Sequence, residues 1–139
     1  MIINAEGLVA GRLASKIAKK AINKETITII NAEKAIIVGT RNSIMPKFEQ
    51  RVNASVKSNP HYGPKYDRIP SKMLRKIIKG MLPRRKKTAE KIIKQITIYN
   101  SIPKNINLEK MEIIENVKCN EKHDFMYLKE IAELLGGKW

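Results

Sequence analysis

Four short apolar runs, rich in β-branched residues, constrain the fold of this chain more than any other feature. They occupy residues 2–4, 26–30, 36–38 and 96–99. Short, almost wholly apolar runs are typical of strands buried in parallel sheets, and helical patterns follow the first and third runs. Strands separated by helices favour a layered α/β fold with a mostly parallel sheet covered on both faces. The chain has 139 residues, which fits one domain.

The segment after the first run has a clear helical pattern of small and apolar residues. Its buried face is predicted to combine two lines of side chains, Leu13, Ile17 and Ala21 in one and Ala10, Ala14 and Ala18 in the other. Such a face allows a helix to pack closely on a sheet.

Further helices are predicted at residues 42–55, 71–79, 88–94 and 128–135. Pro46 is expected in the first turn of its helix, where a missing N–H does no harm. Ser71 is expected to be an N-cap, and Gly80 is expected to follow the end of the same helix. Gly136 and Gly137 are expected to end the last helix. Residues 104–122 fit no single element.

Positive charge is the second unusual feature. The 28 Lys and Arg residues exceed the 13 Asp and Glu residues by 15. The excess is uneven, because residues 1–104 carry a net charge of +17 and residues 105–139 a net charge of −2. A polyanion relieves such self-repulsion, and nucleic acid is the commonest polyanion in cells. The basic part of the chain is therefore predicted to bind nucleic acid; a merely solvated cationic surface is the alternative.

The stretch from Ser71 to Lys91 is strongly basic. Its helix divides into an apolar side and a cationic side: Leu74, Ile77, Ile78 and Met81 on the first, and Lys72, Arg75, Lys76 and Lys79 on the second. Like charges in adjacent turns destabilise a helix by roughly a few tenths of a kcal/mol per pair, and no acid lies between Asp67 and Glu90. The cationic side is therefore predicted to face phosphate. Arg84, Arg85, Lys86 and Lys87 follow as a cationic tip.

The first helix carries a second basic stripe, opposite its apolar face. It consists of Arg12, Lys16, Lys19 and Lys20. The stripe suggests a second RNA contact, although lysine stems also cover apolar neighbours on ordinary helix surfaces.

The loop at residues 59–70 is restricted by three prolines and one glycine, and loops of this kind are often functional. Its aromatic and cationic side chains are His61, Tyr62, Lys65, Tyr66 and Arg68. Aromatic rings beside cations stack bases and bind phosphates. An equal alternative is that Tyr62 or Tyr66 packs the loop onto the domain.

Enzymatic interpretations find little support. The turn from Gly7 to Arg12 follows a strand and opens a helix, as a phosphate loop does, but it lacks either established glycine spacing. With His61, His123 and the single Cys119, the sequence offers no catalytic triad, cysteine-based zinc site or intrachain disulfide. A small nucleotide-dependent enzyme and a basic membrane-surface protein remain as alternatives. We expect no cofactor, a cytosolic setting, and neither a secretory leader nor a membrane span.

Several motifs resemble those of a known family, the universal large-subunit ribosomal protein thirteen, in its archaeal and eukaryotic form. The matching segments are Asn4-Ala5-Glu6-Gly7, Gly11-Arg12-Leu13-Ala14-Ser15, Asn31-Ala32-Glu33-Lys34-Ala35-Ile36-Ile37-Val38-Gly39, Gly63-Pro64 through Arg68-Ile69-Pro70-Ser71, Gly80-Met81-Leu82-Pro83 and Tyr99-Asn100-Ser101-Ile102-Pro103. Two positions depart from the family pattern. No glycine follows Pro83 among the basic residues, and Ser101 replaces a glycine, so Asn100 is expected to take the turn because Asn tolerates positive φ.

The resemblance implies a three-layer α/β/α domain with a four-stranded, mainly parallel sheet. It implies a non-enzymatic constituent of the large ribosomal subunit, in the cytoplasm, that binds large-subunit ribosomal RNA and neighbouring large-subunit ribosomal proteins. No membrane or small-molecule substrate is expected. The predicted RNA-binding residues are Arg12, Lys16, Arg41, His61, Tyr62, Lys65, Arg68, Lys72, Arg75, Lys76, Lys79, Arg84, Arg85, Lys86 and Lys87. Charge reversal at Arg75 and Lys79 is expected to weaken RNA binding and leave the fold intact.

Overall fold

The computed structural model describes residues 1–83, 87–103, 111–112, 117–118 and 123–139, with no description of the side chains of residues 87–89 and 111. Strands β1 (Ile2–Asn4), β2 (Ile27–Ile30) and β4 (Ile96–Ile98) pair in parallel with β2 between the other two. The two-residue strand β5 (Met111–Glu112) pairs in parallel with the free edge of β1. The predicted mixed α/β class with a parallel sheet is confirmed.

The third apolar run does not join this sheet. β3 (Ile36–Val38) pairs antiparallel with β6 (Phe125–Tyr127) in a separate two-stranded sheet. The chain leaves β2 through Asn31, which has a φ of 56°, and a 3₁₀ turn, η1 (Ala32–Lys34), so it turns away from the parallel strands. The prediction that the four runs form one four-stranded sheet is therefore wrong.

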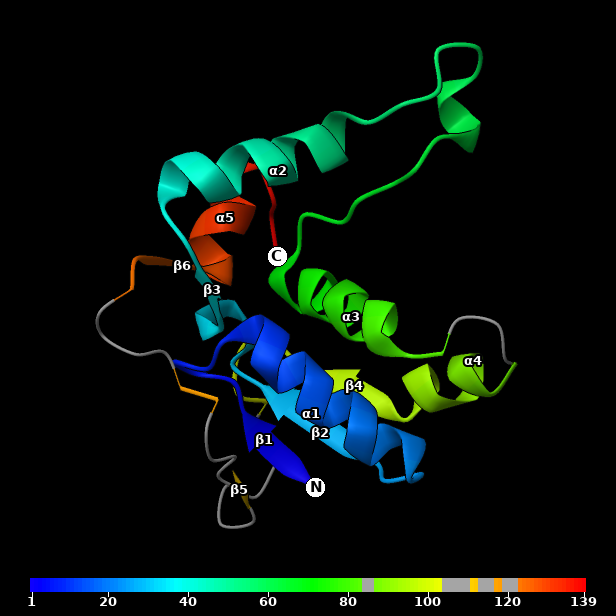
Figure 1. The fold of residues 1–139 in the computed structure, drawn as a ribbon, viewed down its shortest axis with the longest axis vertical. Coiled ribbons are helices and arrows are strands. Elements are labelled where there is room, and N and C mark those ends of the chain that lie inside the picture. Colours follow the sequence, from blue (N-terminus) through cyan, green and yellow to red (C-terminus); the bar gives the residue numbers. More distant parts are fainter. Residues whose placement is uncertain (84–86, 104–110, 113–116, 119–122) are drawn as a thin grey trace.

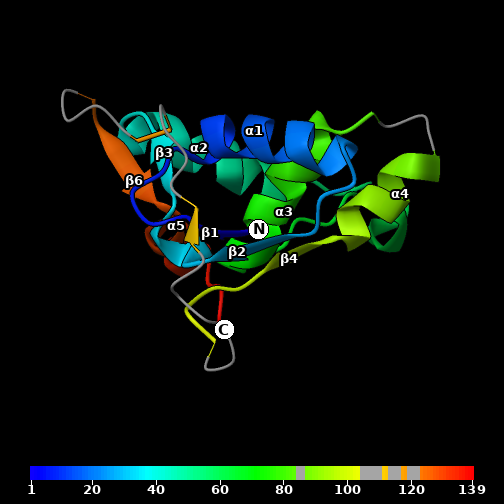
Figure 2. The same cartoon turned by 90° about the horizontal axis from the view of Figure 1, so that it is seen from below.

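Helix α1 (Ala10–Ile22) lies across one face of the parallel sheet (Figure 1, Figure 2). All six of its predicted apolar positions are buried, which confirms the predicted face. On the opposite face of the sheet, the register aligns Ile2, Thr28 and Thr97, and Thr97 is exposed. No described helix buries this row, so the predicted cover of both faces is not found in the described part of the chain.

Lys24 follows the C-terminal cap of α1 in the left-handed conformation, with a φ of 66°. Replacing Lys24 with glycine is expected to raise the free energy of unfolding by about 0.5–1 kcal/mol, because glycine has no Cβ to clash there. Urea unfolding measures the change. Gly7 also has a positive φ, 69°, with open space around its Cβ position. Gly7→Ala is therefore expected to lower the free energy of unfolding. A destabilised Lys24→Gly variant would contradict this interpretation.

Helix α2 (Arg41–Asn53) contains Pro46 in its second turn. The expectation of a first-turn proline is wrong, since the helix begins at Arg41 and the carbonyl of Asn42 faces a residue with no N–H. After α2 the chain forms an arm, residues 54–69, that projects beyond α2 and α3 (Figure 1). A 3₁₀ turn, η2 (Pro60–Tyr62), forms the tip of this arm.

Helix α3 (Pro70–Met81) returns from the arm and packs against α1. Its caps differ from those expected: Ile69 is the N-cap, Pro70 is the first helical residue, and Gly80 lies inside the last turn. Proline at the first position explains the start, because its φ suits the helix and its N–H is not needed. The N–H of Ser71 donates to Oδ1 of Asn100, at 2.9 Å, so a distant residue supplies the missing acceptor.

Asn100 therefore acts differently from what the sequence suggests. Among the described residues other than glycine, positive φ occurs at Lys24 and Asn31. The expectation that Asn100 takes a left-handed turn is wrong; its side chain serves α3 instead.

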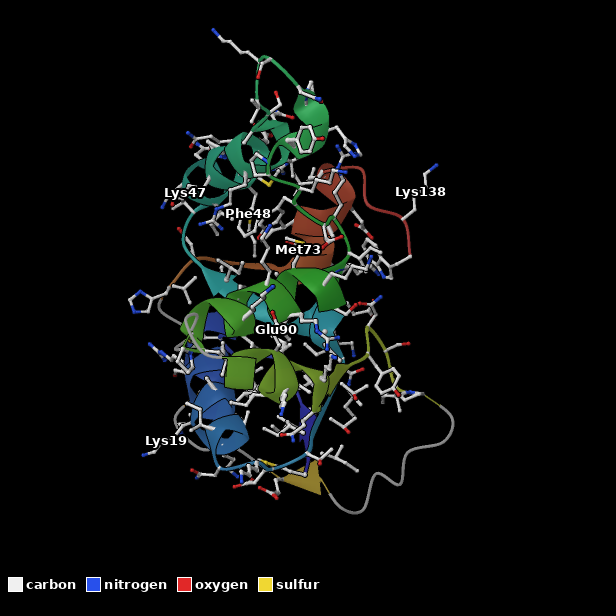
Figure 3. All side chains as sticks on the ribbon, turned by 90° about the vertical axis from the view of Figure 1, so that its right-hand side faces the viewer. Lys19, Lys47, Phe48, Met73, Glu90 and Lys138 are labelled. Carbon is white, nitrogen blue, oxygen red and sulfur yellow. The ribbon has the colours of Figure 1, made fainter. Side chains whose placement is uncertain are left out.

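Two more helices complete the described structure, α4 (Lys87–Lys94) and α5 (Leu128–Leu134). As predicted, two glycines end α5: the N–H of Gly136 donates to the carbonyl of Glu133, and that of Gly137 to the carbonyl of Ala132. Gly136 has a φ of 76°, as this type of helix ending requires. Phe48 of α2 and Met73 of α3 are buried, and in Figure 3 both lie between the helices, whereas Lys47 and Lys138 point outward.

Candidate nucleic-acid interface

Two adjoining hollows lie along α3 and carry its cations. One, of about 440 Å³, is lined by Asp67, Lys72, Arg75, Lys76, Lys79 and Ile93. The other, of about 460 Å³, is lined by Arg51, Ala54, Pro64, Lys65, Tyr66, Lys76, Ile77 and Gly80. Lys76 belongs to both, and Asp67 is the one acidic residue among these lining residues. We call these the α3 hollows; they bring together Lys65 and all four predicted cations of α3.

Tyr66 connects the base of the arm to this surface. Its ring packs edge to face against Phe48 with 6.0 Å between centroids, and Nζ of Lys76 lies 4.1 Å from its centroid. Burial raises the pKa of the Tyr66 phenol, while the hydrogen bond and charge of Arg51 act in the opposite direction. Tyr66 therefore packs the arm onto the domain, which is the alternative to base stacking given above for this loop.

Lys76 also fixes the arm through its ammonium group, which donates to the carbonyl oxygen of Lys65 at 2.9 Å. Together with the contact to Tyr66, this hydrogen bond positions the base of the arm at the edge of the larger α3 hollow in the absence of a ligand. A preorganised cationic surface binds with a smaller entropic cost than a flexible one.

Arg75 has a structural role in addition to its place in the hollow. Its Nη2 donates to the carbonyl oxygens of Ile93 and Ile96, at 2.8 and 3.1 Å. Ile93 lies in the last turn of α4, where carbonyls lack helical partners and a cation is favoured. Charge reversal at Arg75 would break these bonds, so the earlier expectation of an intact fold does not follow from this geometry.

Lys72 and Lys79 are exposed cations of the smaller α3 hollow. Lys72 lies 3.6 Å from Asp67, with more than half of each side chain exposed, so the pair is worth roughly 0–1 kcal/mol. The ammonium group of Lys79 has no hydrogen-bond or ion-pair partner among the described residues. Both ammonium groups are accessible to a phosphate.

The cations of α1 lie toward a different edge of the sheet. Arg12 donates to the carbonyl of Lys118, and Lys20 lies 3.0 Å from the carboxylate of Glu112 in β5. Arg75 reaches β4, at the opposite edge. Lys16 is half-buried and lies midway between Arg12 and Lys20 in the same i, i+4 row of α1. The structure therefore separates the two predicted basic stripes.

The remaining predicted residues are dispersed. Arg41 lines another hollow, which also includes Leu134. Arg68 is exposed beside Gly136. His61 and Tyr62 lie at the tip of the arm. Arg84, Arg85 and Lys86 lie outside the described residues, and Lys87 begins α4 with an undescribed side chain.

The sequence prediction missed Arg51. Its guanidinium lies 5.4 Å from the ring of Phe48 and 6.0 Å from that of Tyr66, and it lines the larger of the α3 hollows. The available signal was its position three residues after Phe48, which places both on one side of a helix, in a stretch without acids from 50 to 66.

The turn before α1 does not form an open phosphate loop. The N–H groups of Gly7, Leu8 and Val9 donate to carbonyls of Lys34, Ala5 and Val117. A phosphate loop needs such N–H groups free to point at the ligand. Within the described ranges there is no group of three or more metal-binding side chains, and no helix long and apolar enough to span a membrane.

Comparison with known proteins agrees with the motifs. The model of the family described as ribosomal protein L13 matches residues 1–105. A protein named large ribosomal subunit protein uL13 from Methanosphaera stadtmanae is 42% identical over 99% of this chain and 98% of its own. Proteins of the same name from Thermoplasma volcanium and Methanococcus maripaludis are 36% and 35% identical, over 98% and 100% of this chain and 98% and 99% of theirs. The chain therefore belongs to the ribosomal protein L13 family.

Proposed function

We propose that this protein is a non-enzymatic constituent of the large ribosomal subunit, with the α3 hollows as a principal contact to large-subunit ribosomal RNA. The observation that carries the proposal is the arrangement of six cations around the two hollows with a single acid among them: Arg51, Lys65, Lys72, Arg75, Lys76 and Lys79. Cations held on rigid elements neutralise phosphates and release counterions. The relatives' names place those proteins in the large ribosomal subunit.

The proposed role includes stabilising the RNA during subunit assembly and translation, with the whole chain as one domain. The α1 stripe of Arg12, Lys16, Lys19 and Lys20 supplies a second RNA contact at the other edge of the sheet. Neighbouring ribosomal proteins are proposed to contact the exposed apolar side chains of the small sheet, Val38, Phe125 and Tyr127, which are 38–40% exposed.

Replacing both Lys72 and Lys79 with glutamate is expected to weaken binding to deproteinised large-subunit ribosomal RNA about 10- to 100-fold at physiological salt. The slope of log affinity against log salt should fall by about 2, because two phosphate contacts are lost. Filter binding over a range of salt concentrations measures both quantities. Lys72 and Lys79 do not anchor the core, so the circular dichroism spectrum should stay unchanged.

A double variant with the same change in net charge provides the control. Lys129 and Lys138 are exposed near the C-terminus, outside the α3 hollows, and Lys129→Glu with Lys138→Glu is expected to change the affinity much less. Equal losses in the two double variants would show that net charge, rather than this surface, governs binding.

A further inference from the structure

Tyr62 stands apart from the other large apolar side chains of the described chain. It is 82% exposed, whereas the next most exposed, Ile22, is 50% exposed. It lies at the tip of the arm, beyond α2 and α3 (Figure 1). Tyr66, at the base of the same arm, accounts for the arm's packing on the domain, so packing does not explain Tyr62.

The turn that carries Tyr62 is ordered by its own hydrogen bonds. Oδ1 of Asn59 accepts from the N–H of His61 at 3.0 Å, and the carbonyl of Asn59 accepts from the N–H of Tyr62 at 3.2 Å. Pro60 restricts the first position of the turn. The ring is therefore presented by a defined turn, which limits the entropy lost on binding.

Gly63 closes the tip by letting the two sides of the arm approach each other. A Cβ at Gly63 would lie 3.1 Å from the backbone nitrogen of Val56 and 3.2 Å from the carbonyl oxygen of Pro60. These contacts are closer than most side chains permit, so the tip is a closed loop from 56 to 63. The closed tip therefore fixes the position of Tyr62 within the arm.

The segment that carries the ring is basic and contains no acid. Residues 50–66 contain no acid, and their basic side chains are Arg51, Lys57, His61 and Lys65. The His61 ring packs edge to face with Tyr62, at 5.8 Å between centroids. A flat ring on a basic arm without acids matches a nucleotide, which offers a π face and a phosphate. An apolar protein pocket would match a tip with more apolar neighbours.

We propose that Tyr62 stacks on an unpaired nucleotide of the RNA, while the α3 hollows bind the phosphate backbone. A base inside a duplex already stacks on both faces, so the partner must be a bulge, loop or strand end. The inference rests on the proposed RNA-binding function and adds the class of RNA feature that the arm tip recognises.

The test compares wild-type protein, Tyr62→Ala and Tyr62→Phe on deproteinised large-subunit ribosomal RNA. Loss of one stacked base is expected to weaken the binding of Tyr62→Ala about 5- to 100-fold. The salt slope should not change, because no phosphate contact is lost. Tyr62→Phe keeps the ring and is expected to bind like wild type. Acylation of ribose 2′-hydroxyls should reveal an unpaired nucleotide that is protected by wild type and Tyr62→Phe and reactive with Tyr62→Ala.

Two results would overturn the proposal, and they are distinguishable. If Tyr62→Ala binds the RNA as tightly as wild type and protects the same nucleotides, then Tyr62 does not stack on RNA and a protein partner is the better explanation. If the wild-type protein shows no salt-dependent RNA binding, the proposed function fails as well. Tyr62 does not belong to the core, so urea unfolding of all three proteins should agree.

Discussion

Gly137→Ala is expected to lower the free energy of unfolding by about 3 kcal/mol, the largest effect of a single methyl group that we foresee in this protein. A Cβ at this position would collide with the carbonyl oxygen of Arg68 and lie 2.9 Å from that of Ala132. Both are backbone atoms, so neither can rotate away as a side chain does. The N–H of Gly137 also donates to Ala132 at the end of α5, and any shift would strain that hydrogen bond.

Gly11→Ala provides the matched control. Gly11 is exposed in the first turn of α1, and a Cβ there would meet nothing within 4 Å. Alanine is a better helix former than glycine, so this variant is expected to gain about 0.5 kcal/mol. Urea unfolding measures the free energies of unfolding of both variants. Fluorescence of Trp139, near Gly137, and circular dichroism serve as separate probes. Equal stability of Gly137→Ala and wild type would show that the turn after α5 does not need glycine.

Arg75→Ala is expected to be the second large effect, a loss of about 3 kcal/mol in the free energy of unfolding. The substitution removes two hydrogen bonds from a charged donor and leaves the carbonyls of Ile93 and Ile96 without this partner. Arg75→Lys should recover only part of the loss, because an ammonium group lacks the planar fork of a guanidinium. Urea or thermal unfolding of the purified variants measures the loss.

Lys79→Ala, four residues along the same helix, is the control for Arg75. Lys79 is exposed, and its ammonium group has no partner among the described residues. The free energy of unfolding of Lys79→Ala should therefore differ from that of wild type by less than about 0.5 kcal/mol. Lys79→Ala is expected to weaken RNA binding, and it does so without the loss of stability that accompanies Arg75→Ala. A stable Arg75→Ala variant would show that the contact to α4 and β4 contributes little to the fold.

Helix positions were predictable from sequence because apolar periodicity depends on local neighbours. The buried face of α1 matches the predicted one at all six positions. The partner of a strand is set by distant residues instead. The run at 36–38 has the composition of a parallel strand, yet Gly39 donates to the carbonyl of Asp124 and the run pairs antiparallel with β6. No local signal identifies a partner nearly 90 residues away.

The candidate site was predictable to the same extent. The four cations of α3 share one helix face, so their spacing placed them together, as the smaller hollow has them. The double role of Arg75 was not predictable, because the two carbonyls that it binds lie on other elements. For Arg51, the spacing from Phe48 was visible in the sequence, but the contact with Tyr66 was not, because the arm brings Tyr66 back to α2 from 15 positions away.

The bond between Ser71 and Asn100 sets an order on folding during synthesis. The first turn of α3 receives this acceptor from a residue 29 positions later, and Arg75 finds its acceptors at Ile93 and Ile96. A ribosome must therefore add roughly 20 residues beyond the end of α3 at Met81, a few seconds at most at typical elongation rates, before the basic helix can be locked in place. Until then the nascent chain carries its positive charge on an uncapped helix, and the finished cationic surface forms only when β4 has joined β2.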